Sequence, residues 1–355
     1  MPSPYDLFSH SRRSVSSVGC FTYRFNHASD SPSIEGSGGI MHVMKRAFAR
    51  AVSEGLRAFS HFERRRRDAV DLAARIAPPP ILIVGAPRSG STLLYQLLTN
   101  SFEVGYQSNL MCMFFRTPSF GLGAHERLFG QAAFNVFQSS HGRTVSLREP
   151  SECGKFWYQW FPRDRHFVDS GETSETALRE IRATFAIIAR QSGRPFLMKN
   201  LNCGQRLRPL SEALPELIPI FVRRDPVETA ASILRARVKA HGHKETWWSV
   251  RPRDYEDLRG LPYPQQVARQ VYLLERQILT DFNRFPRSQR LIVDYRRLCS
   301  DPGETLDRFE ALVRANGAPL ARRAESVIPA LRQRTPDESG DVELIRQAVR
   351  ELDWS

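Results

Sequence analysis

Short apolar runs alternate along this chain with longer stretches in which apolar residues recur every three or four positions. The runs are rich in β-branched and aliphatic residues, which is typical of strands that are buried on both faces of a parallel sheet. The longer stretches have the periodicity of amphipathic helices. Strands are predicted at 81–84, 195–200, 217–222 and 290–295, with a further short strand or turn at 103–109. Helices are predicted at 92–98, 175–191, 207–214, 267–282 and 304–315.

This alternation predicts an α/β fold, a doubly wound parallel sheet of four or five strands flanked by helices. Residues 107–170 interrupt this alternation of strands and helices with an irregular stretch that is rich in aromatic residues. We interpret it as an insertion over the carboxyl edge of the sheet, where ligands bind in such folds. The domain is expected to span residues 78–335, with a C-terminal helical segment at 336–355.

The first 77 residues have a different character. Residues 1–40 are rich in Ser, Gly and His without periodicity, and we expect a disordered leader there. The pattern from 41 to 77 predicts a basic amphipathic helix that ends before the prolines at 78–80, with an apolar stripe and the arginine run 64–67. Such a helix can contact a membrane surface or pack on the domain with its basic face in solvent, and the pattern favours the second arrangement.

Composition limits the class of protein and its partners. The 355 residues carry a net charge of +13, so we expect a polyanionic partner: nucleic acid, an anionic membrane or a multiply phosphorylated cofactor. The five cysteines are scattered and never form a C-x-x-C pair, which argues against a disulfide framework or a zinc site. Because the chain also shows no long apolar stretch and no secretory signal, we expect a cytoplasmic protein.

The first predicted strand leads through a loop bounded by Gly85 and Gly90 into a helix. This arrangement directs backbone N–H groups and the positive end of a helix dipole at one spot, which suits a phosphate group. Nucleotide hydrolases of the G-x-x-x-x-G-K-[ST] type need a lysine where this chain has Ser91, and here Arg88 supplies a cation inside the loop instead. ATP hydrolysis is therefore a poor fit, although an ordinary strand-to-helix turn would have the same pattern.

Three cations follow three predicted strands: Arg88, Lys199 and Arg224. The carboxyl ends of parallel strands lie side by side, so these cations are expected to meet around one anion.

The motifs around these cations resemble those of sulfotransferases that use 3′-phosphoadenosine 5′-phosphosulfate (PAPS). Residues 87–94, Pro-Arg-Ser-Gly-Ser-Thr-Leu-Leu, resemble the loop that binds the 5′-phosphosulfate. Arg224-Asp225-Pro226, with Ser232 eight positions after the arginine, resembles the family's 3′-phosphate-binding strand and helix. Lys199, twenty-five positions before Arg224, matches the catalytic lysine. The resemblance covers about residues 80–330.

A late segment, 292–302, resembles a family strand that usually reads Tyr-Glu-Asp-Leu. Here Arg296 and Arg297 replace the acidic pair, so only Tyr295 is carried over, as a cofactor contact.

The resemblance implies roles for these residues in binding PAPS without a metal. Arg88 and the N–H groups of the following four residues would hold the 5′-phosphosulfate: Ser89, Gly90, Ser91 and Thr92. Lys199 would neutralise the leaving oxygen, while Arg224 and Ser232 would bind the 3′-phosphate. Sulfuryl transfer resembles phosphoryl transfer in its loose transition state, so fixed positive charge matters most, and one preorganised donor contributes about 3 kcal/mol.

A general base is harder to identify. Where many family members have a Glu after the loop helix, this chain has Gln107-Ser108-Asn109, and where soluble relatives have a His after the lysine it has Leu201-Asn202. Candidates in the insertion are Glu149, Glu152 and His141. We choose Glu149 because burial beside Trp157 would raise its pKa.

The aromatic cluster at 156–161 is either core or a surface that stacks on sugar rings, which would suit a carbohydrate or glycolipid acceptor. The predicted function is sulfuryl transfer from PAPS to a hydroxyl or amine, with the nucleotide and one acceptor as partners and no nucleic acid. The alternatives are a P-loop nucleotide kinase or NTPase and a non-catalytic basic protein that binds membrane or nucleic acid.

Overall fold

The computed structural model describes residues 59–130, 137, 144, 146–326, 328–329, 331 and 340–354. The predicted leader, residues 41–58 of the predicted N-terminal helix and His141 lie outside these residues. The domain boundaries predicted above therefore stay predictions.

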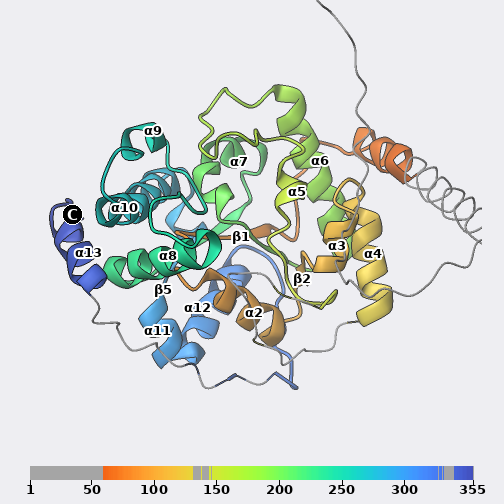
Figure 1. Ribbon diagram of the computed structural model, residues 1–355. Coiled ribbons are helices and arrows are strands. Elements are labelled where there is room, and N and C mark those ends of the chain that lie inside the picture. The colour runs from red at the N-terminus through yellow and green to blue at the C-terminus, as the bar shows by residue number, and fades with distance from the viewer. Residues whose placement is uncertain are drawn as a thin grey trace, which may run out of the picture. The chain divides into compact units, whose positions relative to one another are not determined.

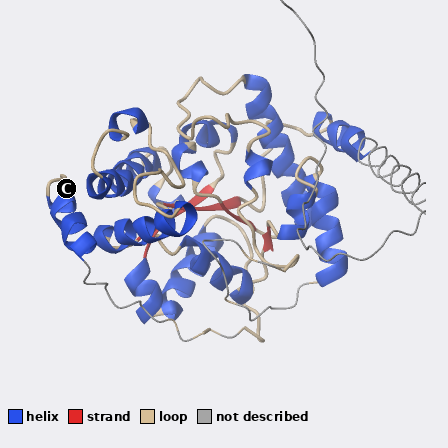
Figure 2. Ribbon diagram, viewed as in Figure 1, coloured by secondary structure: helices blue, strands red, loops and turns tan. Residues whose placement is uncertain are grey.

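Five parallel strands form one sheet in the order β2-β3-β1-β4-β5 (Figure 2). Their bounds are β1 Pro80–Gly85, β2 Gly105–Tyr106, β3 Phe196–Lys199, β4 Ile218–Arg223 and β5 Leu291–Asp294. The prediction of a doubly wound parallel sheet is confirmed. β1 occupies the centre, and all of its residues are buried, as its unbroken apolar run predicts.

Helices cover both faces of this sheet, and the alternation of side chains along β1 defines the two faces. Ile81 and Ile83 belong to the core under α2 (Ser91–Ser101) and α12 (Pro302–Ala315). Leu82 and Val84 belong to the core under α6 (Glu175–Ser192), α7 (Leu207–Ala213) and α10 (Tyr263–Phe282) (Figure 1).

The remaining helices are shorter or lie further from the sheet. They are α3 Asn109–Met113, α4 Pro118–Phe129, α5 Gly154–Trp157, α8 Pro226–His241, α9 Tyr255–Leu258, α11 Tyr295–Ser300 and α13 Gly340–Arg350. Two 3-10 turns cover Asn202–Gln205 and Arg287–Gln289. The C-terminal helix α13 joins a third apolar cluster with residues of α8 and α10.

The insertion is more regular than predicted, since it contains α3, α4 and α5. Ser108 caps α3 by accepting the Met111 N–H, and Pro118 occupies the first turn of α4. These are local start signals that the aromatic composition of the segment obscures.

The N-terminal helix ends earlier in the structure than predicted. Among the described residues the helix covers 59–68, and the chain then continues without helix to β1. Arg182 of α6 holds this connection, because its guanidinium donates to the carbonyls of Leu72 (2.5 Å) and Ala74 (2.7 Å). It also pairs with Glu216 at 3.1 Å, so these backbone carbonyls are satisfied without helical hydrogen bonds.

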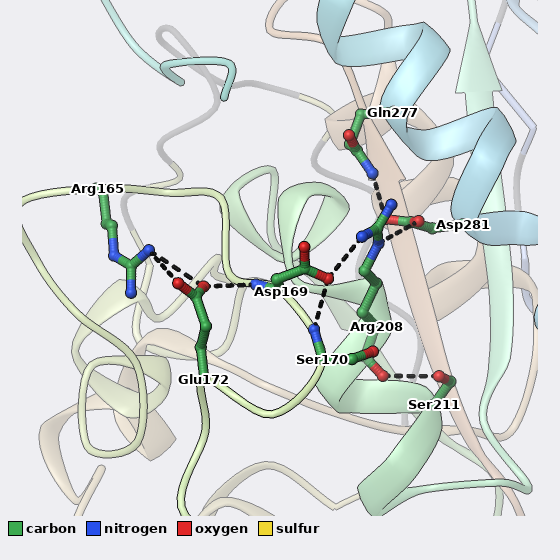
Figure 3. A network of polar contacts seen from close by, with 8 residues as sticks. All are labelled: Arg165, Asp169, Ser170, Glu172, Arg208, Ser211, Gln277 and Asp281. Carbon is green, nitrogen blue, oxygen red and sulfur yellow. Dashed lines mark hydrogen bonds and ion pairs between the residues drawn. The ribbon is translucent and has the colours of Figure 1, made fainter. Parts of the chain in front are cut away.

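A polar network ties the insertion to α7 and α10 (Figure 3). Arg208 of α7 donates to Asp281 of α10 at 2.8 Å and to Asp169 of the insertion at 2.5 Å. Asp281 is only 1% exposed and accepts a further hydrogen bond from Gln277. The arginine is therefore the cation that balances a buried carboxylate.

Substituting Arg208→Met should lower the free energy of unfolding by about 3 kcal/mol, because it leaves the buried Asp281 without a cation. Urea denaturation at neutral pH measures this loss. As a matched control, Arg165→Met breaks the exposed pair with Glu172 and should cost within about 1 kcal/mol. Equal losses for the two variants would contradict the assignment.

Candidate functional site

The loop between β1 and α2 has the backbone shape of an anion site. Arg88 and Gly90 both adopt positive φ, 69° and 96°. Gly90 is the N-cap of α2 and supplies no capping side chain, so the N–H groups of Ser91 and Thr92 in the first turn are available to a ligand. The Ser89 N–H differs from its neighbours, because it donates to the Ala86 carbonyl at 3.2 Å. The predicted set of four N–H donors is therefore reduced by one.

Arg88 and Arg224 meet at this loop from opposite directions. The Arg88 Nε donates to the Ser232 hydroxyl of α8 at 3.1 Å. The Arg224 Nη1 donates to the Arg88 carbonyl at 3.4 Å, while its Nε donates to Glu228 at 3.0 Å. The end of β4, the start of α8 and the loop after β1 are thus joined, as the parallel pairing of β1 with β4 requires.

Tyr295 closes this side of the site. The Arg224 guanidinium lies 4.5 Å from the centre of the Tyr295 ring, a cation–π contact. The ring also packs against the loop, since a Cβ at Gly90 would lie 2.2 Å from the tyrosine Cδ2. Burial raises the pKa of Tyr295, so its phenol stays protonated near neutral pH. A cavity of about 360 Å³ opens here, lined by Arg224, Asp225, Glu228, Asp294, Tyr295 and Arg296.

Lys199 reaches the same loop from β3, whose register sets it beside Ile83 of β1. Its side chain is 2% exposed, and the Nζ donates to the Thr92 hydroxyl at 3.1 Å. The ammonium also forms an ion pair with Glu152 of the insertion. Of the three cations that follow the predicted strands, Arg88 belongs to the segment from Arg88 to Thr92, and Lys199 and Arg224 both contact it.

The two described candidate carboxylates, Glu149 and Glu152, have different surroundings in the structure. Glu149 is buried, and its Oε2 accepts the Ser146 N–H at 2.7 Å while its carbonyl accepts the Asn109 N–H, so it holds a turn of the insertion against the start of α3. Glu152 is the carboxylate at Lys199, and Asn200 fixes it by donating to the Glu152 carbonyl at 3.0 Å.

Several contacts of this site carry no clear sequence signal. Thr92 was predicted to contribute only its backbone N–H, whereas its hydroxyl also accepts a hydrogen bond from Lys199. The paired residues Glu152 and Lys199 are 47 positions apart in the sequence. The Arg224–Glu228 pair could have been found, because its i,i+4 spacing at a helix start is a known stabilising pattern.

The aromatic cluster of the insertion is mostly core. Phe156, Trp157 and Phe161 are buried with residues of α6, so their faces are not open to a sugar ring. Tyr158 is only partly buried, and its hydroxyl accepts a hydrogen bond from Asn202 at 3.0 Å.

Within the part of the chain that the structure describes, no group of three metal-ligating side chains is found, and no helix has the length and hydropathy to cross a membrane.

Comparison with known proteins identifies related sequences and structures. A family model described as "Sulfotransferase family" matches residues 79–313. The chain is similar to sulfotransferase STF1 from Mycobacterium tuberculosis H37Rv, with 14% identity and a TM-score of 0.44 over 83% of this chain and 82% of that one. It is also similar to a sulfotransferase from Alicyclobacillus acidocaldarius, with 16% identity and a TM-score of 0.39 over 78% and 97% of the two chains. No curated protein matches the sequence.

The contact between Gly90 and Tyr295 yields a test of the site's geometry. Gly90→Ala should lower the free energy of unfolding by more than Gly193→Ala does. Both positions have positive φ, at which a side chain costs about 1 kcal/mol, but a Cβ at Gly193 meets nothing within 4 Å. Thermal or urea unfolding of the two variants measures the difference.

A double-mutant cycle with Tyr295→Ala isolates the contact. Removing the ring should relieve most of the additional cost of Gly90→Ala. Strict additivity of the two substitutions would show that the ring does not pack against this loop.

Proposed function

The chain belongs to the sulfotransferase family, and from this premise we propose that it transfers a sulfuryl group from PAPS to a hydroxyl acceptor. One observation carries the proposal: the segment from Arg88 to Thr92 is contacted by Lys199 and Arg224 from the two neighbouring strand ends, and its first helical N–H groups lack a side-chain cap. Such a donor set suits a ligand with two separate anionic groups.

We assign the 5′-phosphosulfate to Arg88 and the N–H groups of Gly90, Ser91 and Thr92. Ser89 is left out as an N–H donor because its N–H is already bonded within the loop. The 3′-phosphate is assigned to Arg224 and Ser232, with Tyr295 as the surface that orients Arg224. These residues line or adjoin the 360 Å³ cavity at the ends of β4 and β5.

The residues of the chain divide the chemistry between them. PAPS supplies the sulfuryl group, whose bond to the bridging oxygen breaks as the bond to the acceptor oxygen forms. Lys199, held by Thr92, neutralises the charge that develops on the bridging oxygen. Glu152, beside Lys199 and 33% exposed, accepts the proton of the acceptor hydroxyl. This replaces Glu149, which the structure places in a turn.

The acceptor is proposed to enter beside Glu152, whose carbonyl accepts a hydrogen bond from Asn200, two positions before the Asn202 that bonds to Tyr158. A carbohydrate or glycolipid hydroxyl is the class we propose, because the Tyr158 ring is partly exposed and its hydroxyl bonds to Asn202, three positions after Lys199. The amine acceptor and the kinase or NTPase activities remain alternatives that the following measurements distinguish.

Binding of 3′-phosphoadenosine 5′-phosphate (PAP), the product nucleotide, should raise the melting temperature by several degrees. A ligand at a hundred times its dissociation constant adds about 2.7 kcal/mol to stability. Arg224→Ala should abolish this shift, whereas Arg297→Ala, which removes an exposed arginine of α11, should preserve it. Stabilisation by ATP with Mg²⁺ but not by PAP would refute PAPS as the donor.

The role of Glu152 has its own test. Glu152→Gln should lower the rate of ³⁵S transfer from labelled PAPS to a panel of carbohydrate and glycolipid acceptors by about 10²-fold or more, because it removes the base. Its PAP-induced thermal shift should persist, which separates catalysis from binding. Glu149→Gln is the matched control, and the assignment fails if that variant loses transfer activity while Glu152→Gln retains it.

A further inference from the structure

An apolar groove lies on the surface between the helix at 59–68 and α4. Its volume is about 520 Å³, and its apolar lining includes Phe59, Phe62, Phe120 and Leu128. Phe62 is 59% exposed and Leu128 is 67% exposed, so both present most of their side chains to solvent. The Phe59 and Phe120 rings stand 4.4 Å apart, which makes the surface continuous across the two helices. Contiguous exposed apolar surface of this kind marks an interaction site.

Polar contacts hold the first helix firmly on the domain. Glu63 is 1% exposed, and its carboxylate accepts both the N–H and the hydroxyl of Ser119 at the start of α4. Arg66 donates to the Gln191 side chain of α6 at 3.3 Å, and Gln191 in turn donates to the Ser119 carbonyl at 2.8 Å. The exposed phenylalanines therefore lie on the same face of the helix as Glu63 and Arg66, which fix that helix to α4 and α6.

Arginines surround the groove. Arg66 and Arg127 belong to its lining, and Arg64 and Arg65 are exposed on other faces of the same helix. Arg67 has a distant carboxylate partner, Glu180 at 3.9 Å. Neither Arg64 nor Arg65 forms an ion pair with a described residue. The groove thus has two arginines in an otherwise largely aromatic and aliphatic lining, and the helix beside it carries two further exposed arginines.

We propose that this groove and its arginines bind an anionic lipid bilayer, with the apolar side chains at the level of the headgroups and the guanidinium groups on lipid phosphates. An apolar strip flanked by arginines is the pattern of interfacial helices. Charge complementarity identifies the partner, because juxtamembrane basic residues gain affinity from anionic lipid. A nucleic acid would use the arginines but leave Phe62 and Leu128 in water. The inference does not depend on the proposed enzymatic function.

The experiment is co-sedimentation of the full chain with vesicles of equal parts phosphatidylglycerol and phosphatidylcholine, compared with phosphatidylcholine alone. Binding is expected to the anionic vesicles and to weaken with added salt. Arg64→Glu combined with Arg65→Glu should reduce partitioning about tenfold or more. Phe62→Ser combined with Leu128→Ser should do so as well, because both side chains are exposed and their loss leaves the fold intact.

Matched controls change the same residue types elsewhere. Arg284→Glu with Arg287→Glu alters two exposed arginines beyond α10, and Leu344→Ser alters a leucine of α13 that is 49% exposed. Neither should change partitioning, and circular dichroism should confirm that all variants are folded.

Three results would overturn the proposal. The first is no binding to anionic vesicles. The second is binding that the groove and arginine variants leave unchanged, which would assign it to another part of the chain. The third is a groove-dependent dimer in light scattering, or groove-independent binding to duplex DNA, without any lipid effect.

Discussion

The repulsion between cations at the carboxyl edge of the sheet is the constraint that shapes this structure. Parallel pairing of β3, β1 and β4 places Lys199 and Arg224 on either side of the loop that carries Arg88. The fold balances this charge with carboxylates, since Glu152 pairs with Lys199 and Glu228 with Arg224. An anionic ligand that enters the site competes with carboxylates for cations that are already oriented, which is a form of preorganisation.

Arginine serves two purposes in the described chain, and net charge alone does not separate them. Arg206 is fully buried against the rings of Tyr158 and Phe161, and its guanidinium donates to backbone carbonyls of the insertion. Arg182 and Arg208 likewise join segments of the fold. The net charge of +13 therefore overstates the charge available to partners. The arginines around the loop after β1 and around the groove at α4 are the ones to which we assign ligands.

The sheet and the loop follow from the sequence because each depends on local pattern and on parallel topology. An unbroken apolar run such as Ile81–Val84 is compatible with few structures other than a strand buried on both faces of a sheet. The choice between Glu149 and Glu152 does not follow, since a three-residue difference in a non-repetitive segment is decided by tertiary contacts such as that of Asn200. The end of the first helix was missed for a similar reason, because Arg182, more than a hundred positions away, captures the carbonyls after it.

The packing of Tyr295 against Gly90 links the first strand–helix turn of the domain to the residue that follows its last strand. The two positions are separated by most of the domain, so this contact belongs to the non-local kind that forms late in folding. The ribosome must therefore release β5 and α11 before Tyr295 can pack against Gly90. Nascent chains that stop short of this point would retain the glycine loop but lack the ring that Arg224 contacts.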